Sequence, residues 1–469
     1  MEKEVKKNLA FSPKNFWKEA SKEEVAAAQE FSTDYIQFLN ECKNVRETIN
    51  YTERELVKAG YDEILNVDGA KKVYSIFRGK TMAFAVIGNR PVSDGVNIIA
   101  AHVDAPKIDL KQNPLYEDSS ASLAMGKTHY YGGIKKYQWV STPLAIHGVV
   151  IDNEGNRIDI CIGEDEKDPV FIIPDLLPHL ARKVQYSKKI GEAITADKLN
   201  VILGSIPVED KDQKDAIKYH VLELLNEKYG IEEVDFLSAE LELVPAGKAR
   251  EVGLDRSLVM GYGQDDRICA YTGLKALLEI ATEDMERTSI VYFSDKEEVG
   301  SDSNTGAKSI FIQDFVGDVL KQNGEDSGSY NLRKTLMKSK VLSADVNAPM
   351  NPNYPSVHEK MNAPVCGFGV TLLKYTGAGG KGGSNDANAE FNAEVIRIFN
   401  QDHIFWQTGT LGKVDEGGGG TIAMFLAQFG ADVIDCGPSL LGMHSLYEVV
   451  SKADLYSSYR AYKSFMLKA

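Results

Sequence analysis

Short apolar runs alternate with amphipathic segments through much of this chain. The runs at 96–101, 289–293 and 431–436 indicate buried strands, whereas 267–281 and 388–401 have the apolar spacing of helices. Residues 33–60 are expected to form one helix capped by Thr33, and the last helix is expected to begin near Ser445. Strands that alternate with helices predict an α/β fold, with a mostly parallel central sheet flanked by helices.

The middle of the chain differs in texture. Between about residues 110 and 250 the runs are short and alternating, and DNEGNR between two of them is a hairpin signal. We therefore predict a β-rich domain at 110–250, inserted into a discontinuous catalytic α/β domain formed by 1–109 and 251–469.

Composition restricts the class of protein. A net charge of −15 over 469 residues argues against nucleic acid or an anionic membrane as the main partner. Five scattered cysteines without a CxxC pair suggest reduced thiols, and no uncharged apolar stretch reaches membrane-spanning length. A cytoplasmic location without membrane attachment is the expectation.

Two glutamates stand directly after a predicted buried strand in TSIVYFSDKEEVGS. Carboxylates at such a place are costly to bury unless a cation compensates for them. Neighbouring side chains do not readily serve one metal from the same direction, so we expect one of Glu297 and Glu298 to bind metal and the other to move a proton. The competing interpretation is an exposed turn, because Asp295 and Lys296 stand alongside.

Other histidines and acids follow predicted strands or open predicted helices. In a parallel sheet ligands bind beyond the carboxyl ends of the strands, which is where these residues are expected to lie. Considered alone, each of these residues could also have a purely structural role. Acids at a helix start, for example, are favoured by capping and by the helix dipole. The residues are His102, Asp104, Asp265, Asp266, Asp345 and His444.

Taken together, two imidazoles and three carboxylates suit a dinuclear metal centre. With two divalent cations and one hydroxide the formal charge sums to zero, as a buried site of two Zn²⁺ ions requires. Mn²⁺ or Co²⁺ would suit the same ligands, and no HExxH motif is present to indicate a single-zinc protease. The expected ligands are His102, Asp265, Glu298, Asp345 and His444.

The segments AHVDAPKIDL, GYGQDDRICAY, FSDKEEVGS, LSADVNA and GMHSLYE, in that order, resemble the aspartyl aminopeptidase family of dizinc exopeptidases, and most closely a bacterial branch of it. The resemblance implies that Asp265 bridges the two metals, that Glu297 is the general base and that Asp104 supports His102. It also implies a tetrahedral homododecamer built from dimers through the inserted domain. In that assembly His179, in the segment PHLA, reaches the active site of a neighbouring subunit.

The family's acid-recognising stretch corresponds here to LLKYTGAGGKGGSNDANAE. Lys374 and Lys381 are candidate partners for the carboxylate of an Asp or Glu at the peptide N-terminus. Because this segment is rich in glycine, a broader specificity for the N-terminal residue remains an alternative.

The expected function is therefore a metalloaminopeptidase that acts on peptides. Two alternatives remain at this point: a related dizinc deacylase or deacetylase of small amides, and a non-catalytic shell protein that keeps the fold for self-assembly. Loss of a ligand or of the base would mark the shell protein, and none is missing from the sequence.

Overall fold

The computed structural model describes residues 9–210 and 212–469, so residues 1–8 of the first predicted domain and residue 211 of the second lie outside it. The chain divides into two compact units. The first unit comprises Met1–Asp104, Ala249–Met443 and Glu448–Ala469, and the second comprises Ala105–Lys248 and His444–Tyr447.

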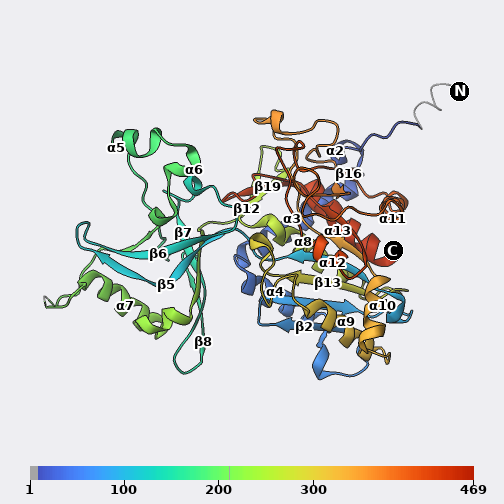
Figure 1. The fold of residues 1–469 in the computed structure, drawn as a ribbon, viewed down its shortest axis with the longest axis horizontal. Helices are drawn as coiled ribbons and strands as arrows, with labels where there is room; N and C mark the ends of the chain where they lie inside the picture. Colours follow the sequence, from blue (N-terminus) through green and yellow to red (C-terminus); the bar gives the residue numbers. More distant parts are fainter. Residues whose placement is uncertain (1–8, 211) are drawn as a thin grey trace. The chain divides into compact units, whose positions relative to one another are not determined.

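A nine-stranded sheet, counted over the described residues, forms the centre of the first unit (Figure 1). Its middle strands β13, β4, β14 and β17 are all parallel, while antiparallel pairings join β2 to β3, β3 to β13 and β17 to β15. The predicted α/β class with a mostly parallel sheet is thus confirmed. In spatial order the strands are β1 (Asp62–Glu63), β2 (Lys72–Phe77), β3 (Thr81–Val86), β13 (Ser289–Ser294), β4 (Asn97–His102), β14 (Lys340–Ser343), β17 (Asp432–Gly437), β15 (Val370–Leu373) and β16 (Trp406–Thr408).

Both faces of this sheet are buried. Successive side chains of β4 point to opposite faces, so that Ile99 and Ala101 join one apolar cluster while Ile98 and Ala100 join another. Continuous apolar runs are typical of strands covered on both sides. The covering helices are α3 (Lys22–Glu41), α4 (Val45–Lys58), α8 (Gln264–Ile280), α11 (Ala389–Gln401) and α13 (Lys452–Lys468) on the first cluster, and α9 (Phe311–Gln322), α10 (Ser329–Met337) and α12 (Ala423–Ala427) on the second.

The prediction of one helix over residues 33–60 is wrong. The chain forms two helices, α3 and α4, and each begins with a capping box: Ser21 pairs with Glu24, and Asn44 pairs with Glu47. Asn44 gives the second helix its own start, because its side chain accepts the backbone N–H of Glu47.

The expected start of the last helix near Ser445 is also wrong. Glu448–Ser451 forms strand β19, which pairs with β12 (Leu258–Gly261), and α13 begins only at Lys452. β-branched Val449 and Val450 favour a strand where a helical stripe also fitted their spacing. The small sheet is completed by β11 (Arg250–Val252) and β18 (Leu440–Leu441).

The second unit is built on a six-stranded sheet whose pairings are all antiparallel over the described residues. The predicted hairpin at DNEGNR is confirmed, since Asp152 N donates to Asn156 O between β7 and β8. In spatial order the strands are β8 (Arg157–Ile162), β7 (Leu144–Ile151), β10 (Glu240–Pro245), β5 (Lys107–Asp118), β6 (Leu123–Tyr131) and β9 (Val201–Gly204), with the helices α5 (Pro178–Ala181), α6 (Ile190–Ala193) and α7 (Ala216–Tyr229).

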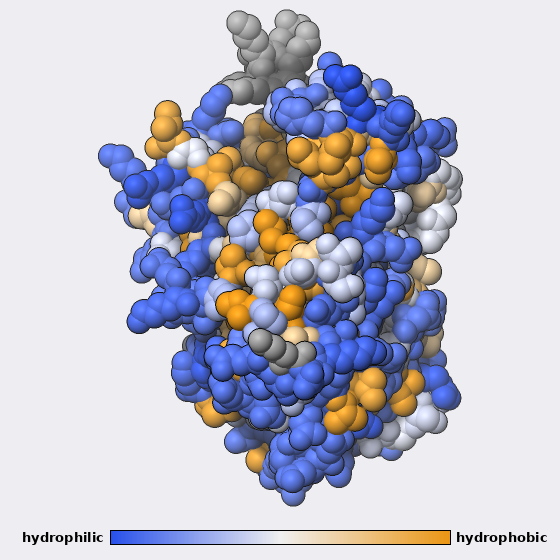
Figure 2. Space-filling model, turned by 90° about the vertical axis from the view of Figure 1, so that its left-hand side faces the viewer, coloured by the Kyte–Doolittle hydropathy of each residue, from blue (hydrophilic) through white to orange (hydrophobic). Residues whose placement is uncertain are grey.

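Apolar side chains remain exposed on the second unit. Figure 2 shows hydrophobic surface among hydrophilic side chains on the side of the molecule that carries α5 to α7. Exposed apolar groups in one stretch mark a candidate interaction surface. They are Val170, Ile172, Leu177, Leu180, Val184, Tyr186 and Ile190.

Candidate metal centre

Three neighbouring parallel strands bring their predicted site residues to one edge of the sheet. Ser294 at the end of β13 pairs with His102 at the end of β4, and Ser343 at the end of β14 pairs with Ala100. Residues that directly follow these strands therefore lie at the same carboxyl edge. Glu297 and Asp345 are such residues, and both approach His102 (Nε2 to Glu297 Oε2, 3.9 Å; Nε2 to Asp345 Oδ1, 4.0 Å).

The His102 ring is oriented by a backbone carbonyl. Its Nδ1 lies 3.0 Å from Asp104 O, an acceptor only, so Nδ1 carries the proton and donates. In the neutral ring Nε2 then presents a lone pair, yet it lies 3.1 Å from Asp265 Oδ1. Two lone pairs at this distance repel unless a proton on Nε2 or a metal ion stands between them. The ring is 1% exposed, so bulk water does not relieve the repulsion.

Asp104 connects His102 to the paired glutamates. Its carboxylate, 1% exposed, accepts the backbone N–H of Glu297 at 3.0 Å and that of Glu298 at 3.2 Å. The same side chain lies 3.3 Å from His102 Nδ1. One buried carboxylate thus orients the histidine and holds the 3₁₀ turn Glu297–Val299 that follows β13.

The start of α8 supplies two further carboxylates, from Asp265 and Asp266. Candidate ligand atoms fall into two groups, each within 4.8 Å: His102 with Asp265 and Glu298, and His102 with Asp266 and Asp345. Asp266 is fully buried, and its Oδ2 also accepts the backbone N–H of His102 at 3.4 Å.

The electrostatics of this cluster call for positive charge. Burial raises the pKa of Glu298 and of Asp345 well above the usual range, and neighbouring carboxylates raise both further. Burial alone would lower the pKa of His102, but the carboxylates of Asp104 and Asp265 outweigh it and raise that pKa. Imidazole with several carboxylates is a donor set that suits Zn²⁺, so the residues present fit the metal.

Sequence reasoning missed one contributor, Glu448. Its Oε2 accepts the backbone N–H of Asp265 at 3.1 Å, and the residue is 1% exposed. A signal was available: GMHSLYEVV places an acid directly before an apolar pair, the same pattern of a costly buried charge that marked the paired glutamates.

Two predicted histidines lie in the second unit. The Nδ1 of His444 donates to Gly133 O at 3.1 Å, which leaves Nε2 as the nitrogen that can bind a metal. His179 lies in the short helix α5 and is exposed.

The two lysines expected at the substrate side chain both contact one acid. Lys374 Nζ lies 2.5 Å and Lys381 Nζ 2.7 Å from the carboxylate of Asp386, and all three side chains are exposed. These two ion pairs hold the pKa of Asp386 below its usual range. The lysines therefore bring one net positive charge to this loop.

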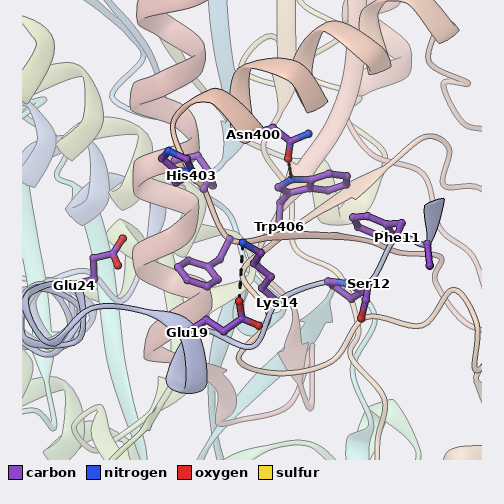
Figure 3. A pocket seen from close by; sticks show the side chains of 12 residues that line it. Phe11, Ser12, Lys14, Glu19, Glu24, Asn400, His403 and Trp406 are labelled. Carbon is purple, nitrogen blue, oxygen red and sulfur yellow. Dashed lines mark hydrogen bonds and ion pairs between the residues drawn. The ribbon is translucent and has the colours of Figure 1, made fainter. Parts of the chain in front are cut away.

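A separate hollow of about 400 Å³ is drawn in Figure 3. Its lining includes Lys14 and Glu19, which form an ion pair, and Trp406, whose ring stacks on Phe11 at 5.1 Å. None of the predicted metal or catalytic residues lines it. The contacts anchor the segment that precedes α2 (Phe16–Glu19).

A parallel-rich α/β sheet with a buried imidazole–carboxylate cluster at its carboxyl edge defines a metal-dependent hydrolase. In the part of the chain that the structure describes, no helix has both the length and the apolar composition needed to cross a lipid bilayer. Comparison with known proteins narrows the class. The chain belongs to the aminopeptidase I zinc metalloprotease (M18) family, whose model matches residues 38–466.

Relatives match over nearly the whole chain. A probable M18 family aminopeptidase 1 of Thermotoga maritima is 49% identical over 459 residues, covering 97% of this chain and 99% of the relative. Its counterpart in Clostridium acetobutylicum is 47% identical over 460 residues, covering 97% and 98%. The crystal structure of an M18 aminopeptidase from Thermotoga maritima has a TM-score of 0.93 at 48% identity and covers 98% of this chain and 100% of that one.

The predicted family and enzyme class are therefore confirmed. The protein is a hydrolase, a zinc aminopeptidase that removes N-terminal residues. Of the three functions considered from the sequence, the family supports the aminopeptidase.

Proposed function

We propose that the chain binds two zinc ions through His102, Asp265, Glu298, Asp345 and His444, with Asp265 shared between them. The observation that carries this proposal is the approach of His102 Nε2 to the carboxylate of Asp265, 3.1 Å away within a buried cluster of candidate ligand atoms. Mn²⁺ or Co²⁺ would fit the same donors. Asp266, which belongs to the second group of candidate ligand atoms, is the alternative to Asp265.

Bound metal ions would polarise the scissile carbonyl and lower the pKa of a water molecule. Glu297 is the proposed general base: its carboxylate is partly exposed and its backbone N–H is fixed by Asp104. It takes the proton of the attacking water and later donates it to the leaving amine. Glu298 is held by the same carboxylate but is more deeply buried, which suits a ligand better than a proton carrier.

The test compares two adjacent isosteric variants with aminoacyl-nitroanilide substrates. Glu297→Gln is expected to lower kcat by about 10²–10⁴-fold while keeping two equivalents of bound zinc. Glu298→Gln is expected to lose zinc as well as activity. Unchanged turnover in Glu297→Gln would remove the general base from the mechanism, and turnover of N-acyl amino acids alone would favour a deacylase.

For the substrate, we propose a preference for acidic N-terminal residues, contributed by Lys374 and Lys381. Asp386 reduces their combined charge from two to one, so the preference is expected to be modest. Peptides with Asp, Glu and Leu at the N-terminus, compared by kcat/KM, measure it directly.

For assembly, we propose a tetrahedral homododecamer built from dimers through the second unit, in the cytoplasm. The exposed apolar side chains on that unit support self-association. A yeast aminopeptidase 1 has been described as a dodecamer, with a TM-score of 0.75 to this chain. His179 would then complete a neighbouring subunit's site. Sedimentation should give twelve copies of the 51.7 kDa chain, and His179→Ala should lower kcat without changing that mass.

A further inference from the structure

The start of α8 is held by a residue that comes almost two hundred positions later in the sequence. We infer that Glu448 is a positioning residue for Asp265: it binds the backbone of Asp265 so that the side chain stays turned toward the metal centre. The inference rests on the proposed function, because it takes Asp265 as a metal ligand.

The first backbone N–H groups of a helix have no partner within the helix. An aspartate near a helix start commonly satisfies one with its own carboxylate, which is the structural explanation for Asp265. Here the residue before α8 is Gly263, which has no side chain to cap the helix. Glu448 Oε2 accepts the N–H of Asp265 instead, at 3.1 Å. The Asp265 carboxylate therefore need not cap the helix and lies 3.1 Å from His102 Nε2.

Glu448 is itself fixed at several points. Its carbonyl oxygen accepts Nε2 of Gln264 at 2.6 Å, and Oε1 of Gln264 accepts the hydroxyl of Tyr35 at 3.1 Å. Glu448, Gln264 and Tyr35 are all at most 1% exposed. A buried network of this kind holds its members in one arrangement.

Pairing of strands in the small four-stranded sheet places Glu448 beside the start of α8. Glu448 is the first residue of β19 and pairs with Gly261 at the end of β12, from which the chain turns directly into α8 (Figure 1). Arg267 supplies nearby positive charge, since its guanidinium donates to Gly263 O at 2.9 Å and to Tyr262 O at 3.2 Å.

The experiment measures zinc affinity by chelator competition in the full-length protein, together with thermal stability of the metal-free form. Glu448→Ala removes the acceptor and is expected to weaken zinc binding about 10–100-fold, the usual range for partners that orient a ligand. Glu448→Gln keeps an acceptor oxygen and is expected to bind zinc within about threefold of wild type.

Asp454→Ala is the matched control. Asp454 is also a buried carboxylate that accepts backbone N–H groups, from Gly367 and Gly369, but it contacts none of the proposed ligands. Its loss should lower stability and leave zinc affinity unchanged. Should Glu448→Ala fail to fold, Tyr35→Phe loosens Gln264 and is expected to shift zinc affinity in the same direction by a smaller factor.

Wild-type zinc affinity in Glu448→Ala, or an equal loss in Asp454→Ala, would overturn the inference. Neither outcome would contradict the proposed function. That proposal is refuted by a different result, namely that the wild-type protein binds no zinc.

Discussion

Replacing Asp104 by alanine should damage stability and metal binding together. The carboxylate is 1% exposed and accepts the backbone N–H groups of Glu297 and Glu298. Each buried donor left without an acceptor costs about 1–3 kcal/mol, so the free energy of unfolding should fall by roughly 2–6 kcal/mol. The loss should be near the lower value if water enters the space and accepts the two N–H groups. His102 also loses its supporting carboxylate, and zinc affinity should fall about 10–100-fold.

The assay separates these two effects. Urea denaturation of the metal-free protein gives the stability change, and chelator competition gives the zinc dissociation constant. Asp454→Ala also removes a carboxylate that accepts two backbone N–H groups, so its stability loss should be similar while its zinc affinity stays at the wild-type value. If both variants lose stability equally and both keep wild-type zinc affinity, Asp104 is a turn-holding residue only and the reasoning about His102 is refuted.

Three further outcomes are expected. Burial raises the pKa of Asp454 to about 7, so the folded state holds a proton that the unfolded chain releases near pH 4. The free energy of unfolding should therefore fall by up to roughly 4 kcal/mol as the pH rises from about 4 to 7. Denaturation of Asp454→Asn across this range should show a flatter pH profile. An unchanged profile would assign the slope to other groups. Gly369→Ala should lower the free energy of unfolding by at least about 2 kcal/mol, because a Cβ there would lie 1.9 Å from Phe405 O and because the residue has a φ of +92°. A melting temperature equal to that of the wild type would contradict this crowding. Lys374→Ala leaves Asp386 with one lysine. Because the lost charge is exposed, the ratio of kcat/KM for Asp- and Glu-peptides to that for Leu-peptides should fall by less than about fivefold. An unchanged ratio would show that this lysine does not take part in substrate selection.

Much of the fold was predictable because its signals are local. The apolar run at 289–293 becomes β13, and the alternating runs around DNEGNR become a hairpin. The errors came where two local signals compete. Residues 33–60 satisfy a helical stripe, but Asn44 and Glu47 form a capping box that starts a new helix. Val449 and Val450 also fit a helical face, and pairing with β12 decides for a strand.

Within the candidate site, the sequence indicates which residues meet but not how each is oriented. Residues that follow parallel strands must share an edge, which is why His102, Glu297 and Asp345 could be grouped in advance. The choice between Asp265 and Asp266 depends on backbone rotation at the start of α8, where both residues have non-helical φ and ψ. No spacing rule contains that information.

The order of strands in the large sheet has a consequence for the synthesis of the chain. Ile98 in β4 pairs with Ile290 on one side and Val341 on the other, and the whole 105–248 segment comes between them in the sequence. A ribosome that has not yet passed Ser294 therefore presents β4 without either of its neighbours. An apolar strand with open edges is a template for pairing with other chains. Truncated products that end within the inserted segment should consequently aggregate, whatever the stability of the finished enzyme.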